Sequence, residues 1–223
     1  MPYTMGSLFW QMNDVWPVAS WACLDFQNNP KAFYYTAKKA FNPIIVVPAN
    51  YKNNFTLSVV SDKRDSFSAK AEMKILDFNG KVLWSKNVPV NIPANTSKEC
   101  FKINTNELVN KMDTTQIVFS VKLLKGDNLL ATNVCYFTEP KNLKLLKSEI
   151  IKTIKETRDG YSITLTANKL VKDLYLDTDL KGWFSDNCFD ILPGEKVIVS
   201  FKTKEKTENF GEKLKLFSLT DSY

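Results

Sequence analysis

The chain has 223 residues, of which 44% are hydrophobic and 24% charged, as is typical of a globular protein with one large domain or two smaller ones. The net charge of +6 is spread along the chain rather than gathered in a basic stripe, which argues against a nucleic-acid partner. The absence of histidine excludes Ser-His and Cys-His catalysis and histidine-ligated zinc.

Hydropathy and cysteine spacing exclude further classes. Since no apolar run reaches about 18 residues, we expect no membrane-spanning helix and no membrane partner. The N-terminus also lacks the basic and apolar regions of a signal peptide. The cysteines are widely spaced and include no Cys-x-x-Cys pair: Cys23, Cys100, Cys135 and Cys188. We expect no metal and no cofactor, and we interpret the cysteines as small buried side chains, with a Cys100–Cys135 bridge left open.

Residues 1–41 differ from the rest of the chain, because they contain no glutamate and ten aromatic side chains. The apolar run Leu8–Trp10 predicts a buried strand, and a cluster of polar and aromatic residues extends from its end to Pro17. In parallel α/β enzymes the carboxyl ends of strands carry the active site. A single strand cannot close a barrel, so we expect residues 1–41 to be a piece of an active-site rim.

A helix is predicted to follow this cluster. Asn29 before Pro30 is a typical helix start, with Asn29 as the N-cap and Pro30 at the first helical position. Apolar residues then recur at helical spacing, at Phe33, Ala37, Ala40 and Phe41. Strand, loop and helix in this order predict one β/α unit of a parallel fold.

The pattern changes to strict alternation over residues 42–139. About seven short strands are indicated, among them Phe55–Val59 and Phe67–Ile75. Asn79-Gly80 between two such runs predicts a hairpin with a type I′ turn. This number of strands in about 95 residues predicts an immunoglobulin-like sandwich.

Residues 140–223 show a smaller set of alternating runs. Turns are predicted at residues 158–160 and at Pro193-Gly194, and Glu139-Pro140-Lys141 is the expected linker. The chain is therefore expected to be mainly β, with a strand–loop–helix remnant of a (β/α)8 barrel at 1–41 and two immunoglobulin-like sandwiches at 42–139 and 140–223.

Two motifs resemble one known family. The segment Met5-Gly6-Ser7-Leu8-Phe9-Trp10-Gln11-Met12-Asn13-Asp14-Val15-Trp16-Pro17, with Ser20-Trp21 and residues 34–39, resembles the end of the catalytic barrel in β-mannosidases of glycoside hydrolase family 2. Residues 186–195, from Asp186 to Glu195, resemble part of the last immunoglobulin-like domain of those enzymes.

This resemblance implies a retaining hydrolase that removes terminal β-mannose units with two glutamates about 5–5.5 Å apart. Both glutamate motifs of the family would lie upstream of residue 1, and the first glutamate here, Glu72, falls in a predicted sandwich strand. We therefore expect no catalytic residue in this chain and no activity from it alone. The missing N-terminal and barrel domains would be its partners, and a β-mannoside or oligosaccharide the ligand of the parent enzyme.

The resemblance also assigns a substrate wall. Trp10 would stack on the reacting sugar beside an unusual cis peptide bond, Asn13 and Asp14 would bond sugar hydroxyls or orient loops, and Trp16 would line the outer pocket. Purely structural roles stay open for two of these side chains and for Trp21. Trp16 and Trp21 fit packing under the loop equally well, and Asp14 fits capping of the next turn.

Three further hypotheses follow. The runner-up function is a non-catalytic carbohydrate-binding or adhesion module whose sandwich loops bind glycan. The aromatic residues Phe9, Trp10, Phe33 and Tyr34 are expected to pack on the first sandwich or on another copy of the chain, so residues 1–41 could form a homo-oligomer contact. By resemblance, the parent would be periplasmic, secreted or lysosomal, although the residues of this chain leave the compartment unknown.

Overall fold

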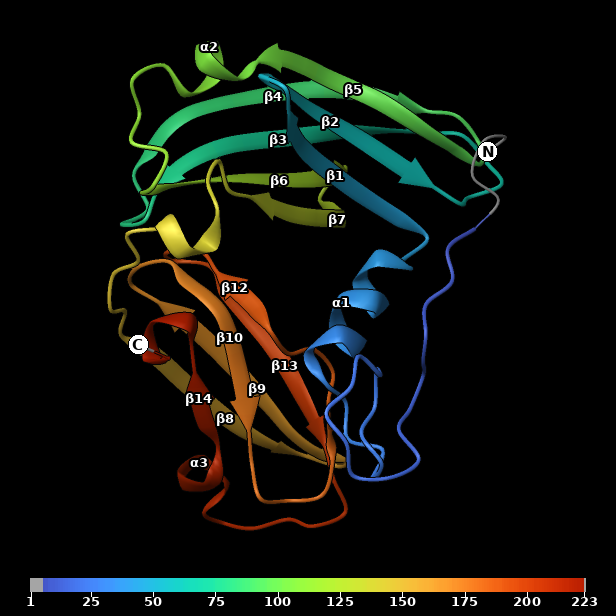
Figure 1. The fold of residues 1–223 in the computed structure, drawn as a ribbon, viewed down its shortest axis with the longest axis vertical. Helices are drawn as coiled ribbons and strands as arrows, with labels where there is room; N and C mark the ends of the chain where they lie inside the picture. The colour runs from blue at the N-terminus through green and yellow to red at the C-terminus, as the bar shows by residue number, and fades with distance from the viewer. Residues whose placement is uncertain (1–5, 223) are drawn as a thin grey trace. The chain divides into compact units, whose positions relative to one another are not determined.

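The computed structural model describes residues 6–222, so Met5 of the first motif lies outside the described residues. The described residues form two compact units. The first unit consists of residues 40–144 with Gly6, and the second of residues 7–39 and 145–222. The N-terminal segment therefore belongs to the same unit as the C-terminal part of the chain (Figure 1).

The first unit is a sandwich of two antiparallel sheets, with strand orders β1-β2-β5 and β4-β3-β6-β7 (Figure 1). Its elements are β1 (Ile44–Tyr51), β2 (Asn54–Ser61), β3 (Phe67–Asp77), β4 (Val82–Ile92), β5 (Thr96–Asn104), α2 (Thr105–Val109), β6 (Ile117–Lys125), β7 (Asn128–Cys135) and the 3-10 turn η1 (Pro140–Asn142).

Alternation of apolar and polar residues explains this sandwich. Phe55, Leu57 and Val59 on β2 are all 0% exposed, whereas the residues between them lie nearer the surface. Phe55 meets Phe119 of β6 at a centroid distance of 4.5 Å, so the two sheets share one core. Side chains of one face turn inward because successive residues of a strand point to opposite sides.

The Asn79-Gly80 hairpin forms between β3 and β4, but its turn is not type I′. Only Gly80 has a positive φ (93°), whereas a type I′ turn requires positive φ at both central residues. The Asp77 carboxylate accepts hydrogen bonds from the backbone N–H groups of Asn79 and Lys81, both at 2.9 Å. These bonds and the irregular register after Ile75 give a longer turn than the sequence predicted.

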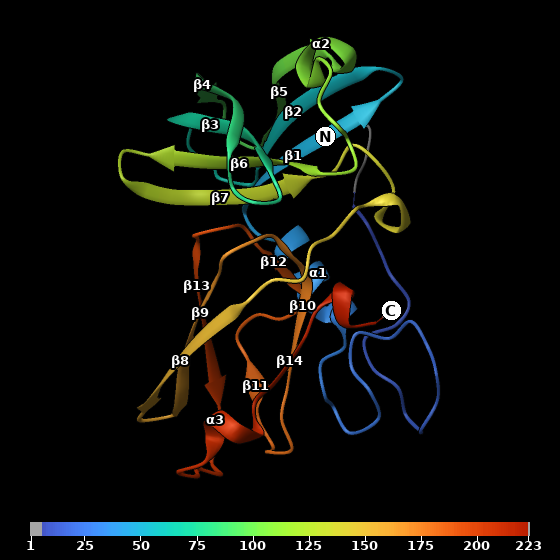
Figure 2. The same cartoon turned by 90° about the vertical axis from the view of Figure 1, so that its left-hand side faces the viewer.

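The second unit has sheets with strand orders β12-β10-β14 and β11-β13-β9-β8, and Figure 2 shows β8, β9 and β13 lying side by side. Its elements are α1 (Ala32–Ala40, of which residues 32–39 belong to this unit), β8 (Ile150–Thr157), β9 (Gly160–Ala167), β10 (Val171–Asp177), β11 (Trp183–Phe184), β12 (Phe189–Ile191), β13 (Lys196–Lys202), α3 (Phe210–Lys213), β14 (Lys215–Phe217) and the 3-10 turn η2 (Leu219–Asp221).

Aromatic side chains fill the core of this unit. Phe210 stacks on Tyr161 at 4.0 Å and on Phe201 at 5.4 Å, and all three are almost fully buried. The expected mainly β architecture with two sandwiches is confirmed.

The strand expected at Leu8–Trp10 is wrong. These residues form no strand, and Leu8, Phe9 and Trp10 are 103%, 38% and 74% exposed. A strand needs a neighbour for its backbone hydrogen bonds, and bridging in this segment begins only at Asn13, which pairs with Leu24.

The helix exists but begins and faces differently from the prediction. It starts at Ala32, and the Asn29 side chain donates to Asp25 instead of capping it. Phe33 and Phe41, on the expected apolar face, are 38% and 60% exposed, while Tyr35 is the buried residue. The face that packs carries Tyr34 and Tyr35, because the available neighbours are aromatic and polar groups of residues 175–189.

The N-terminal aromatic residues have contacts within the second unit. Trp10 stays exposed, Phe9 packs edge-to-face on Phe33 at 5.2 Å, and Tyr34 packs on Trp183 of the second unit at 5.6 Å. Packing on the first sandwich or on another copy of the chain remains a prediction.

All four cysteines are free thiols, so no Cys100–Cys135 bridge forms. Cys23 is buried as expected, but the expectation is wrong for Cys100, Cys135 and Cys188, which are only partly buried. Burial raises the pKa of Cys135 to about 11. No helix among residues 6–222 is long and apolar enough to cross a membrane.

Candidate substrate-wall site

The backbone of residues 11–31 folds back on itself through a small set of hydrogen bonds. The N–H groups of Cys23 and Leu24 donate to the carbonyls of Gln11 and Met12 at 3.2 and 2.9 Å. The Asp14 N–H returns a bond to the Leu24 carbonyl at 3.1 Å. Ala22 and Cys23, both 1% exposed, lie at the centre of this fold-back. The segment thus has a defined path without belonging to a sheet.

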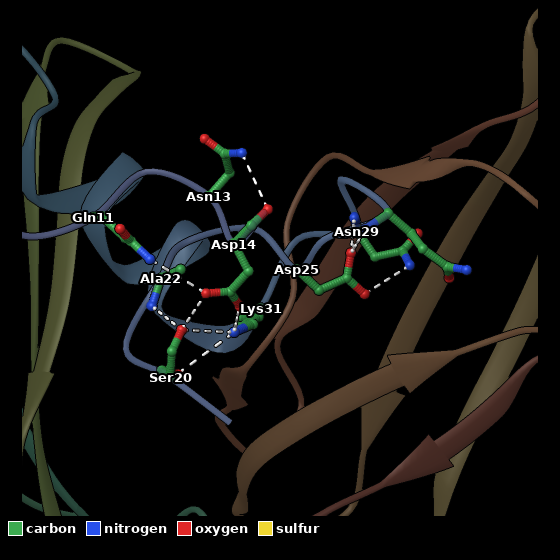
Figure 3. Close-up of polar contacts among 9 residues, drawn as sticks. Gln11, Asn13, Asp14, Ser20, Ala22, Asp25, Asn29 and Lys31 are labelled. Carbon is green, nitrogen blue, oxygen red and sulfur yellow. Dashed lines mark hydrogen bonds and ion pairs between the residues drawn. The ribbon is translucent and has the colours of Figure 1, made fainter. Parts of the chain in front are cut away.

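A buried carboxylate holds the fold-back together. Figure 3 shows three side chains converging on Asp14: Lys31 Nζ lies 2.6 Å from Oδ2, Ser20 Oγ donates to Oδ1 at 2.5 Å, and Gln11 Nε2 donates to Oδ1 at 3.4 Å. The Asp14 side chain is 1% exposed. The hydrogen bonds from Lys31 and then Ser20 lower the pKa of Asp14, so it stays ionised at neutral pH.

A second carboxylate fixes the loop before the helix. Asp25 accepts hydrogen bonds from the backbone N–H groups of Gln27 and Asn29 at 2.8 Å each. It also accepts one from Asn29 Nδ2 at 2.9 Å, and Figure 3 shows Asn29 beside Asp25. Desolvation alone would raise the pKa of Asp25, but the bonds from Asn29 and Gln27 outweigh it and lower that pKa. Asp25 is therefore occupied within its own loop.

The four predicted wall residues divide into two groups. Trp10 and Trp16 are 74% and 64% exposed, and the Trp10–Gln11 peptide bond is cis. Asn13 is exposed, with its Nδ2 donating to the Asp14 carbonyl at 3.2 Å. Asp14 points inward, where Lys31, Ser20 and Gln11 occupy it. Two indoles and one amide are thus presented outward on a segment held by the fourth residue.

The helix attaches this segment to the C-terminal strands. Lys38 Nζ donates to the Ser185 carbonyl at 2.9 Å, and Lys39 Nζ pairs with Asp186 at 3.0 Å. Asn187, 2% exposed, bonds both the N–H and the carbonyl of Leu176, at 2.7 and 2.8 Å. The second motif, which begins at Asp186, therefore holds the surface that receives the helix.

Sequence reasoning missed Lys31, Ser20 and Gln11 as partners of Asp14. Ser20 and Gln11 stood inside the recognised motif, so a partner search among its polar residues could have found them. Lys31 lies 17 positions beyond Asp14, and no periodic spacing links the two. In the described part of the chain, no cluster of three or more cysteine or acidic side chains offers a metal site.

Two family models match most of the chain. Residues 53–142 match a mannosidase Ig/CBM-like domain, and residues 145–222 match an Ig-fold domain of mannosidases. Among curated relatives, β-mannosidase A of Aspergillus oryzae is 27% identical over 90% of this chain, and the β-mannosidase of Rattus norvegicus is 26% identical over 99%. The chain spans only 24% and 26% of the length of these two relatives.

Solved structures give the same result. The β-D-mannosidase of Dictyoglomus thermophilum is 29% identical, with a TM-score of 0.85 over 97% of this chain and 26% of its own. The exo-chitosanase CsxA of Amycolatopsis orientalis, at 15% identity and a TM-score of 0.70, shares the fold. The chain belongs to the β-mannosidase family, in which it corresponds to a C-terminal portion with two immunoglobulin-like domains.

Proposed function

We propose that this chain is the accessory portion of a β-mannosidase that removes terminal β-mannose units, and that residues 10–16 supply part of the wall that holds the sugar. The exposure of Trp10 on a segment fixed by the buried Asp14 carboxylate carries this proposal. An indole offers a flat apolar surface of the kind that covers the C–H face of a pyranose. An exposed aromatic side chain on a fixed segment suits ligand binding better than one on a mobile loop, because the fixed segment loses less conformational entropy when the ligand binds.

Within this wall the residues have different tasks. Trp10 stacks on the sugar ring, Trp16 extends the apolar surface, and the exposed amide of Asn13 bonds hydroxyls. Asp14 does not contact the sugar, since its carboxylate oxygens already accept hydrogen bonds from Lys31, Ser20 and Gln11. It positions the two tryptophans and the amide.

Hydrolysis itself is proposed to depend on carboxylates outside this chain. A retaining glycosidase needs two carboxyl groups about 5–5.5 Å apart, one of them an acid with a raised pKa. The only acidic residues in the segment 7–39 are Asp14 and Asp25, and hydrogen bonds lower the pKa of each carboxyl group. Glu72 forms an ion pair with Lys70 on β3 in the other unit. None of these groups suits a general acid beside Trp10.

The experiment uses 4-nitrophenyl β-D-mannoside with the purified 223-residue chain. We expect saturation transfer from protein to the sugar protons, loss of that signal in Trp10→Ala, and no release of nitrophenol. Tyr51→Ala, which removes an exposed aromatic from the first unit, is the control and should bind like the wild type.

Two outcomes would contradict the proposal. Nitrophenol release that persists after repeated purification would place catalysis in this chain. Sugar binding that survives deletion of residues 1–41 would favour a carbohydrate-binding sandwich, a function also compatible with the Ig/CBM-like description of residues 53–142.

A further inference from the structure

The second unit contains a cleft of about 1040 Å³ that shares no lining residue with the Trp10–Trp16 wall. Residues 25–32 form one wall of the cleft, and residues 175–184 form the other. Tyr35 and Phe201 line its inner part. A volume of this size is just above the range, about 300–1,000 Å³, that small-ligand sites usually occupy.

The first wall is held in shape by the Asp25 loop. The three hydrogen bonds that Asp25 accepts from Gln27 and Asn29 fix residues 25–29 as a tight turn. Asn28 sits in the left-handed region, with a φ of 66°. This turn leaves the side chains of Gln27 and Asn28 exposed at the cleft.

The second wall is fixed against strand β13, the residue that follows it and helix α3. Thr203 Oγ1 donates to the Lys181 carbonyl at 2.7 Å, and Asp179 pairs with Lys213 at 2.7 Å. A Cβ on Gly182 would lie 2.4 Å from the Phe201 ring, so only glycine permits this close approach. Both walls are thus held by bonds of their own before any ligand arrives.

The next residue of this wall is an aromatic platform. Trp183 is 41% exposed and lines the cleft, and its ring packs edge-to-face on Tyr34 at an interplanar angle of 84°. Tyr175, 40% exposed, adds a second aromatic with a hydroxyl group. Contact with Tyr34 limits the rotation of the indole and leaves part of its surface open.

The charges of the cleft largely cancel. Among its ionisable groups, Asp179 pairs with Lys213, Lys31 pairs with Asp14, and Asp25 is bonded within its loop. One carboxylate, Asp177, and one ammonium group, Lys181, are left to meet a ligand. A strongly charged ligand would find too few opposite charges in the cleft. A purely apolar ligand would bury these two polar groups without hydrogen-bond partners.

We infer that this cleft binds a neutral oligosaccharide of about two or three pyranose rings, a length that a pocket of this size accommodates. Trp183 covers a sugar face, and Asp177, Lys181, Gln27 and Asn28 bond hydroxyl groups. The inference rests on the chemistry of the cleft and holds whether or not Trp10 binds mannose.

The test is a titration of the full 223-residue chain with mannotriose, cellotriose and xylotriose, followed by calorimetry or amide chemical shifts. We expect at least one trisaccharide to bind with a dissociation constant of about 1 mM. Trp183→Ala should raise that dissociation constant about tenfold or more. Lys181→Ala, a surface change that spares the indole, should weaken binding severalfold. Tyr51→Ala should leave it unchanged, and circular dichroism checks that each variant is folded.

The inference is overturned if none of the three sugars binds, or if folded Trp183→Ala and Lys181→Ala bind like the wild type. Binding that is lost in Trp10→Ala but retained in Trp183→Ala also overturns it, while supporting the proposed wall. Binding that is lost in Trp183→Ala but retained in Trp10→Ala supports the cleft, whatever becomes of the wall.

Discussion

The sandwich sheets and the segment of residues 7–31 use their aromatic residues in opposite ways. Phe55 and Phe119 are 0% exposed in the first sandwich, and Phe201 is 1% exposed in the second. Trp10, at 74%, faces outward, although its segment is also rich in apolar residues. Sheets hold themselves together by burying one face, whereas the segment relies on one buried carboxylate and a few backbone bonds.

This difference indicates what each region is for. A tryptophan in a core stabilises the fold, but one held outward by a polar clamp contributes little to stability and remains available for contacts. Because large exposed apolar groups on a fixed segment are typical of binding surfaces, the segment is better understood as a surface that meets something else. The following variants test that distinction, from the largest expected effect to the smallest.

Removing a core ring should have the largest effect. Phe119→Ala leaves a cavity beside Phe55 and should lower the free energy of unfolding of the first unit by about 3–5 kcal/mol. Hydrogen exchange of the β6 amides in urea would measure this loss. A change below about 1 kcal/mol would mean that the two sheets do not share the core described here.

Removing the Asp14 carboxylate should loosen residues 7–31 without unfolding the sheets. In Asp14→Ala, the Lys31 ammonium loses its partner, and we expect faster proteolysis within residues 7–31 and a melting temperature lowered by several degrees. Asp65→Ala, which removes an exposed carboxylate of the first unit, is the matched control and should change neither. Equal protease resistance in Asp14→Ala and the wild type would show that other contacts hold the segment.

Lowering the pH should have the same effect as Asp14→Ala, because protonation removes the charge of the Asp14 carboxylate. The pKa of Asp14 is lowered in the folded chain, so its contribution is complete above its unfolded pKa of about 3.9 and is lost as the pH falls through the folded value. We expect the protection factors of the Cys23 and Leu24 amides to stay constant as the pH is lowered to about 4, and to decrease at lower pH. Asp14→Asn should have lower protection and no such step. A step of the same size in Asp14→Asn would assign it to another carboxylate.

Removing the exposed indole should hardly affect stability. Trp10→Ala should change the free energy of unfolding by no more than about 0.5 kcal/mol, as surface substitutions usually do, while abolishing the proposed contact with mannosides. Chemical denaturation beside ligand-observed NMR would separate the two effects. A stability loss of several kcal/mol would show that Trp10 belongs to a core, like Phe119 and Phe201.

The sandwiches could be predicted from the sequence because their signal is local. Alternation in runs such as Phe55–Val59 states directly which face is buried. The same reasoning failed at Leu8–Trp10, since an apolar run is buried only where a neighbouring surface exists to cover it. The type I′ turn at Asn79-Gly80 was wrong because the Asp77 carboxylate stabilises a different turn.

The candidate site could be predicted only in part. The motif with Trp10 and Asp14 was recognisable, but the pairing with Lys31 joins residues 17 positions apart, and such pairs follow from the folded path of the chain. Likewise, the motif that begins at Asp186 was visible, whereas the role of Asn187 in bonding Leu176 depends on where β10 ends. Contacts between distant segments carry no periodic signal.

One measurement tests the central claim most directly: a time course of proton NMR spectra of 4-nitrophenyl β-D-mannoside with the purified chain. The account predicts saturation transfer to the sugar that requires Trp10, and a substrate signal that stays constant throughout. Release of free mannose by the chain, or transfer that is unchanged in Trp10→Ala, would contradict it.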